Sequence, residues 1–209
     1  MHARYLICCL LLGAQAASAA VPVGSVALYS DGRVEKLMAN EAGRLHWEDD
    51  RKRRFVRATN PIVPPLERTD FLSQRGYRQN TASGDPDAIH RLPAGSPVEF
   101  SVIRTRNNGE ISKRYWECVY LGKSRQQVLG TERDLDRYTC ERFVIHRKLH
   151  NRSLREKREF SYSPDLGLVV DLQTQTRKNS SSSRLVGVIP PDKADYRTIS
   201  RAVGKLRKK

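Results

Sequence analysis

Short runs in which apolar and polar residues alternate recur along most of the chain, and residues that favour tight turns separate them. Ser30-Asp31-Gly32 follows one such run, and Asn107-Asn108-Gly109 follows another. Asp-Gly or Asn-Gly between alternating runs is a strong short-range signal of a β-hairpin. The sequence therefore predicts an all-β protein made of antiparallel hairpins.

The distribution of these runs suggests two β-domains. Four or five strands within about 40 residues are typical of a small SH3-like barrel, which we place at residues 20–60. Residues 61–97 are interpreted as a Pro-rich linker because six prolines interrupt them. Residues 98–190 return to alternation and predict an antiparallel β-meander domain.

The last segment, residues 191–209, predicts a short amphipathic helix with a basic tail. Tyr196, Ile199, Val203 and Leu206 repeat at helical spacing after Pro190-Pro191. Docking of this apolar stripe on the sheet is the favoured interpretation, and contact of the basic residues with an anionic membrane is the alternative.

The N-terminus has the pattern of a secretory signal peptide. Arg4 precedes an apolar run at residues 5–12, and small residues follow at 14–20. The run is shorter than the roughly 20 residues of a membrane-spanning helix. We therefore assign residues 1–19 to a cleavable signal peptide and expect a periplasmic or secreted protein with no transmembrane anchor after cleavage.

Export also decides the chemistry of the cysteines. Cys8 and Cys9 leave with the signal peptide, so Cys118 and Cys140 remain. In an oxidising compartment two remaining thiols are expected to form a disulfide. A redox or metal pair is the alternative, but there is no Cys-x-x-Cys spacing and no third cysteine for a zinc site.

Three short motifs occur in order between residues 98 and 190. They are Trp116-Glu117-Cys118, Tyr138-Thr139-Cys140 and the Tyr-x-Pro-x-Leu-Gly turn at residues 162–167. As an ordered set they resemble a group of uncharacterised proteobacterial periplasmic or cell-envelope proteins. The resemblance implies a curved antiparallel sheet in the periplasm and carries no catalytic residues.

The candidates for metal or catalytic chemistry are few. His146 and His150 lie four apart in a predicted strand, which separates them by about 13 Å, too far for one metal ion. Glu48, Asp49 and Asp50 directly precede basic residues and are interpreted as a charged turn. The alternative is a small envelope hydrolase that uses these carboxylates, but no nucleophile or metalloprotease motif accompanies them. We expect no enzyme activity, no catalytic residue, no metal and no cofactor.

Positive charge is the strongest remaining signal, with 38 Lys and Arg against 23 Asp and Glu. A basic hairpin and the basic tail are predicted to attract polyanions. The expected partners are an anionic envelope polymer, lipid headgroups or an envelope protein, and no specific nucleic acid. A general solubility role for the charge is the open alternative. The candidate polyanion-binding residues are Arg142, Arg147, Lys148, Arg152, Arg155, Lys157, Arg158, Lys205, Arg207, Lys208 and Lys209.

Overall fold

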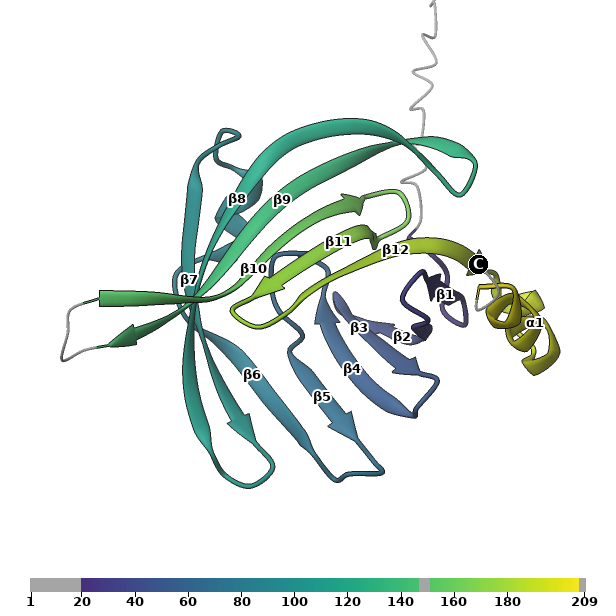
Figure 1. The fold of residues 1–209 in the computed structure, drawn as a ribbon, viewed down its shortest axis with the longest axis horizontal. Helices are drawn as coiled ribbons and strands as arrows, with labels where there is room; N and C mark the ends of the chain where they lie inside the picture. The colour runs from purple at the N-terminus through teal and green to yellow at the C-terminus, as the bar shows by residue number, and fades with distance from the viewer. Residues whose placement is uncertain (1–19, 147–150, 207–209) are drawn as a thin grey trace, which may run out of the picture.

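The computed structural model describes residues 20–146 and 151–206. Twelve antiparallel strands form one closed barrel, in which consecutive strands are neighbours and β1 closes the circle against β12 (Figure 1). The strands are β1 (Val26–Tyr29), β2 (Val34–Glu41), β3 (Arg44–Asp49), β4 (Arg53–Ala58), β5 (Glu67–Asp70), β6 (Gly76–Ser83), β7 (Pro97–Arg106), β8 (Ile111–Val128), β9 (Thr131–His146), β10 (Asn151–Ser163), β11 (Leu168–Thr176) and β12 (Ser180–Ile189). The described helices are η1 (Pro86–His90), η3 (Pro191–Lys193) and α1 (Tyr196–Leu206).

The predicted all-β class and the two predicted hairpin turns are confirmed. β1 pairs with β2 around Gly32, and β7 pairs with β8 around Gly109. Both glycines have positive φ values, +84° and +82°, a conformation that side chains disfavour. The turn residues therefore specify these hairpins locally.

The predicted SH3-like barrel at residues 20–60 is not confirmed. β1 to β4 are neighbours in the same closed sheet as the rest of the chain, because β1 pairs with β12 and β4 pairs with β5. Four short strands bury too little apolar surface to close on themselves. The longer C-terminal strands supply the missing partners.

The segment expected to be a linker, residues 61–97, contributes β5, β6 and η1 to the barrel. Its prolines lie between or at the ends of the strands, where no ladder hydrogen bond is lost: Pro86 starts η1 and Pro97 starts β7. β5 and β6 escape sequence-based prediction because they are polar and mostly half-buried or exposed.

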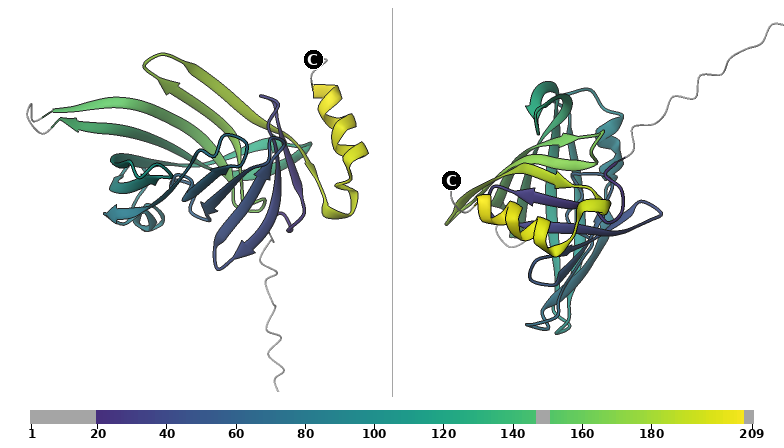
Figure 2. Two further views of the ribbon diagram at one scale, coloured as in Figure 1. Left: turned by 90° about the horizontal axis from the view of Figure 1, so that it is seen from below. Right: turned by 90° about the vertical axis from the view of Figure 1, so that its right-hand side faces the viewer.

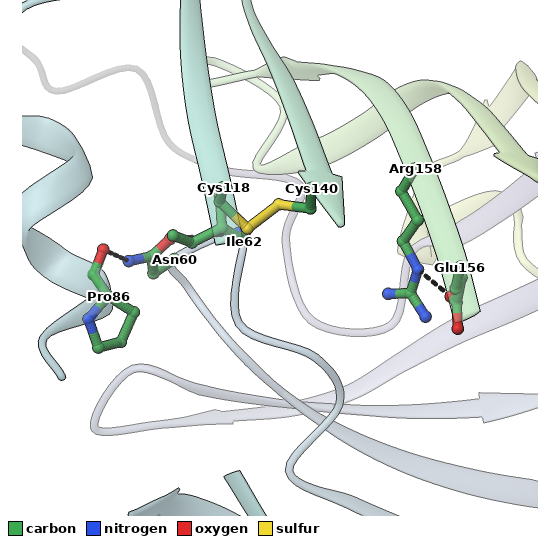
Figure 3. The surroundings of a disulfide bond; sticks show 7 residues. All are labelled: Asn60, Ile62, Pro86, Cys118, Cys140, Glu156 and Arg158. Carbon is green, nitrogen blue, oxygen red and sulfur yellow. Dashed lines mark hydrogen bonds and ion pairs between the residues drawn. A yellow bond between two sulfur atoms is a disulfide. The ribbon is translucent and has the colours of Figure 1, made fainter. Parts of the chain in front are cut away.

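The expected disulfide is confirmed: Cys118 of β8 is bonded to Cys140 of β9, directly opposite in the register. Both half-cystines are buried, in a cluster that includes Phe100, Trp116 and Tyr138. Figure 3 shows this bond with Asn60 and Ile62 of the β4–β5 connection beside it. The disulfide thus joins the two longest strands inside the apolar core.

Helix α1 covers the outer face of the barrel beside β1 (Figure 2). Its Ile199 and Val203 pack against a cluster that includes Val26, Leu28 and Val34, as the docking interpretation expects. Tyr196 is different from the expectation, because it is 86% exposed. It is the first residue of the helix, and the apolar cluster involves the residues that follow it.

Replacement of both half-cystines by alanine tests how much the disulfide contributes. We expect Cys118→Ala/Cys140→Ala to lower the free energy of unfolding by about 3 kcal/mol, the entropy effect typical of a loop of this length. Urea denaturation with and without reductant measures it. Reductant should destabilise the wild type and leave the double variant unchanged; equal stability of the two proteins under oxidising conditions would contradict the expectation.

Candidate functional site

Arginines occupy many positions that face the interior of the barrel. Directly opposite residues of paired strands share one face of the sheet, and the interior face is marked by the buried core. Arg57 lies opposite Leu45, Arg114 opposite Val102, and Arg142 opposite Trp116. The interior-facing arginines identified in this way are Arg57, Arg68, Arg104, Arg114, Arg142 and Arg158.

One carboxylate, Glu35 of β2, is buried among these cations. Arg57 donates two hydrogen bonds of 2.9 Å to its oxygens, and Arg33 donates a third of 3.3 Å. Burial by itself would raise the pKa of Glu35, but attraction and hydrogen bonds from Arg57 and Arg33 outweigh it and lower the pKa. Glu35 is therefore ionised at neutral pH and neutralises part of this cluster.

Glu156 of β10 is a second interior carboxylate. Arg142 donates to it at 3.0 Å and Arg158 at 2.5 Å. Burial would raise its pKa, and the two arginines together lower it. The Arg158 guanidinium also lies 4.8 Å from the Trp116 ring, a cation–π arrangement. Figure 3 shows the pair of Glu156 and Arg158 near the disulfide.

Arg104 and Arg114 differ from Arg57, Arg142 and Arg158 because no ion pair among the described residues includes them. The same holds for Arg68, whose guanidinium lies 5.8 Å from the Phe55 ring. Arg104 lies over the Tyr77 ring at 3.6 Å and donates to Gln79 Oε1 at 2.8 Å. Burial, together with repulsion from Arg114 and Arg142, lowers the pKa of Arg104 to about 10. Arg104 remains charged at pH 7, so this repulsion is present in the folded protein.

A buried donor faces the same region. Gln79 is only 7% exposed, and its Nε2 has no hydrogen-bond partner among the described residues. An unsatisfied buried donor costs about 1–3 kcal/mol. Uncompensated cations beside an unsatisfied donor form a local environment that an anion would stabilise.

A cavity of about 300 Å³ lies inside the barrel. Arg33, Arg57 and Arg158 contribute guanidinium groups to its wall, and Glu156 lies beside them. The apolar and aromatic part of the wall consists of Tyr29, Leu45, Trp47, Phe160, Leu168 and Leu172. Its volume is at the lower end of the range of small-molecule sites, roughly 300–1,000 Å³.

The structure distributes the candidate polyanion-binding residues over two faces of the sheet. Arg142 and Arg158 face the interior and are paired with Glu156. Arg152 is paired with Glu117 at 2.9 Å, and Lys157 with Glu159 at 2.7 Å.

The other candidates are spread further along the chain. Arg155 lies at a bulge in the β9–β10 pairing, and Lys205 is exposed on α1. The remaining candidates, like the predicted signal peptide at residues 1–19, lie outside the described residues; they are Arg147, Lys148, Arg207, Lys208 and Lys209. The sequence suggested seven cations on one surface of this hairpin. The described part of β9 and β10 does not present such a surface.

The carboxylates of the alternative hydrolase are held by neighbouring cations and amides. Lys52 and Arg54 contact Glu48 at 3.0 and 3.1 Å. Asp49 accepts hydrogen bonds from the backbone N–H groups of Arg51 and Arg53, both at 2.9 Å. Glu48 and Asp49 are consecutive in β3, so their side chains point to opposite faces.

The described residues show neither a metal-binding cluster nor a membrane-spanning helix. Within residues 20–146 and 151–206, no three His, Cys, Asp or Glu side chains are placed to hold a metal ion. None of the described helices has the length and apolar character needed to cross a bilayer.

Sequence reasoning missed Arg57, Arg104 and Arg114 as site residues. A signal was present: in each case an arginine stands two residues from a large apolar residue, as in Phe55-x-Arg57, Val102-x-Arg104 and Arg114-x-Trp116. Residues two apart in a strand share a face. Each of these arginines therefore points to the same face of its strand as that large apolar residue, and not to the solvent-exposed face.

Comparison with known proteins identifies the fold. No protein-family model matches the sequence, and no curated protein is significantly similar to it. Among solved structures, the chain is similar to the hypothetical lipoprotein YmcC from Escherichia coli K12, with a TM-score of 0.50 and 11% identity over 83% of this chain and 89% of that chain. It is also similar to a putative exported protein with a YmcC-like fold from Bacteroides fragilis NCTC 9343, with a TM-score of 0.42 and 9% identity over 81% of this chain and 97% of that chain.

The likeness to YmcC extends over most of both chains. At this identity it establishes a shared fold, and it agrees with the expected class of uncharacterised envelope proteins. It does not test the three sequence motifs on which that resemblance was based.

The buried Glu35 predicts a specific dependence of stability on pH. Because its pKa is lower in the folded protein than in the unfolded chain, the unfolded chain binds more protons in acid. Its contribution is complete above about pH 4.5 and decreases as the pH falls below that value. We expect Glu35→Gln to lower the free energy of unfolding by about 3 kcal/mol at pH 7 and to reduce the loss of stability between pH 5 and 3.

Urea denaturation at several pH values measures this effect, and Glu110→Gln is the control. Glu110 makes its ion pair with Arg106 on the surface, where both side chains are about half exposed, so its replacement should change stability by less than about 1 kcal/mol. An acid profile of Glu35→Gln parallel to that of the wild type would show that Glu35 is not the group responsible.

Proposed function

We propose that this protein is an exported, non-enzymatic component of the cell envelope that binds an anionic amphiphile inside its barrel. The single observation that carries the proposal is the pair of interior arginines, Arg104 and Arg114, with no carboxylate partner among the described residues. Uncompensated charge inside a protein costs free energy, and a bound anion would recover it. Export is supported by the leader-like N-terminus and by the shared fold with a protein described as a lipoprotein.

Two parts of the interior define the class of ligand. Arg104 and Arg114, which do not line the cavity, have no carboxylate partner among the described residues, and the cavity wall itself carries Arg33, Arg57 and Arg158. Guanidinium groups bind phosphate and carboxylate oxygens in bidentate geometry. The apolar wall formed by Trp47, Phe160 and Leu168 is suited to a hydrocarbon chain. The ligand that fits both parts has a phosphate or carboxylate headgroup and an alkyl chain.

This proposal moves the anion-binding role from the hairpin surface to the interior. Arg142 and Arg158 keep a role in it, because they face the same interior as Arg104 and Arg114. Arg152 and Lys157 do not contribute, because surface carboxylates already compensate them. For the hydrolase alternative at Glu48, Asp49 and Asp50, no contact among the described residues favours catalysis over local ion pairing.

Tryptophan fluorescence can test this proposal directly, because the chain has two tryptophans and both Trp47 and Trp116 belong to the interior core. Dodecyl phosphate, below its micelle concentration, is the probe. Dodecyltrimethylammonium supplies the same chain with a cation, and inorganic phosphate supplies the headgroup alone. We expect saturable binding of dodecyl phosphate, at least tenfold tighter than binding of either control compound.

The matched variants are Arg104→Gln/Arg114→Gln in the interior and Arg51→Gln/Arg75→Gln on the surface. The interior pair should weaken binding of dodecyl phosphate at least tenfold, about 1.4 kcal/mol, without lowering the melting temperature, because it removes like-charge repulsion. The surface pair should leave binding unchanged. Equal binding of the alkyl cation, or undiminished binding by the interior variant, would refute the proposal.

A further inference from the structure

The topology brings several hairpin turns to one end of the barrel. In a meander of antiparallel strands, the turns that follow odd-numbered strands all lie at the same end. We call this the hairpin end and define it by the turns at residues 50–52, 71–75 and 107–110, which follow β3, β5 and β7. In Figure 1 the β5–β6 and β7–β8 hairpins extend together toward the bottom of the view.

Large apolar side chains are exposed at this end. Phe71 is 54% exposed, Leu72 83% and Ile111 69%. They belong to adjacent turns, because Asn107 donates from its backbone N–H to Gly76 O and from Nδ2 to Gln74 O, each at 3.2 Å. The three residues therefore lie on neighbouring hairpins that are held together.

The β5–β6 turn has a defined structure that presents its apolar residues outward. Asp70 Oδ1 accepts hydrogen bonds from the backbone N–H groups of Leu72 and Ser73, both at 3.1 Å, an arrangement typical of an Asx-turn. Gly76 permits the close approach of the neighbouring strands, since a Cβ there would lie 2.6 Å from Arg68 O. Turn positions usually carry polar residues, so Phe71 and Leu72 are not explained by the turn itself.

Exposed cations lie in or beside the turns that carry these apolar residues. The Arg54 guanidinium lies 5.1 Å from the Phe71 ring. Arg75 is exposed in the same turn, Arg51 is exposed in the neighbouring β3–β4 turn, and neither belongs to an ion pair among the described residues. Lys113 is exposed two residues after Ile111. Exposed apolar side chains flanked by Arg and Lys are typical of segments that bind the interface of anionic membranes.

We propose that the hairpin end docks on the surface of an anionic lipid bilayer, with Phe71, Leu72 and Ile111 at the boundary between headgroups and acyl chains. The flanking cations contact the anionic headgroups. This inference rests on the exposed turns and does not depend on ligand binding inside the barrel.

Vesicle sedimentation with the protein comprising residues 20–209 tests this proposal. The vesicles contain phosphatidylcholine alone or with 30% phosphatidylglycerol, at low and high NaCl. We expect binding to the anionic vesicles at low salt, and at least tenfold weaker binding to phosphatidylcholine. Phe71→Ser/Leu72→Ser should reduce partitioning to the anionic vesicles at least tenfold.

The matched control is Leu129→Ser. Leu129 is also an exposed apolar residue in a hairpin turn, 39% exposed, but it lies between β8 and β9 at the opposite end of the barrel. The Leu129→Ser variant should bind vesicles like the wild type. Arg104→Gln/Arg114→Gln should also bind vesicles like the wild type, and this result would distinguish membrane docking from ligand binding in the interior. Unchanged partitioning of Phe71→Ser/Leu72→Ser, or an equal loss in Leu129→Ser, would overturn the proposal. So would a dimer in sedimentation velocity that this double variant abolishes, because the exposed turns would then be the interface of a second copy.

Discussion

Pairing of β1 with β12 is the contact on which the barrel interior depends. Val26 lies opposite Ile189 and Ala27 opposite Val188, so the first and last strands satisfy each other's backbone groups. Without this pairing both strands would be open edges, and the interior arginines would face water. Helix α1 supports the closure from outside, because its apolar stripe covers β1 and the start of β2.

Closure creates an interior whose charge is only partly compensated. Glu35 and Glu156 each neutralise part of the cluster and are held by two arginines, while Arg104 and Arg114 have no such partner in residues 20–146 and 151–206. This arrangement does not favour stability, since a buried charge without a partner raises the free energy of the folded state. Departures of this kind occur most often at functional sites, and for that reason the interior, rather than the outer surface, is the candidate site.

Much of the local structure could be predicted from the sequence, but the site could not. Turn residues such as Asp31-Gly32 specify hairpins through local backbone preferences, and removal of the predicted signal peptide would leave Cys118 and Cys140 as the pair available for a disulfide. Charge along the chain was a poorer guide. Arg152 and Lys157 are compensated by Glu117 and Glu159, and only Glu159 is close to either cation in sequence.

The sequence by itself determined the all-β class, several hairpins, the disulfide and the docking helix, because each depends on local pattern or on a process of elimination. Only the tertiary structure decided that the chain forms one barrel instead of two domains, and that Arg57, Arg104 and Arg114 face a common interior. The physical reason is that barrel closure and interior charge arise from pairing between strands far apart in the chain. Alternation gives each strand two faces, and only the closed sheet establishes which face is inside.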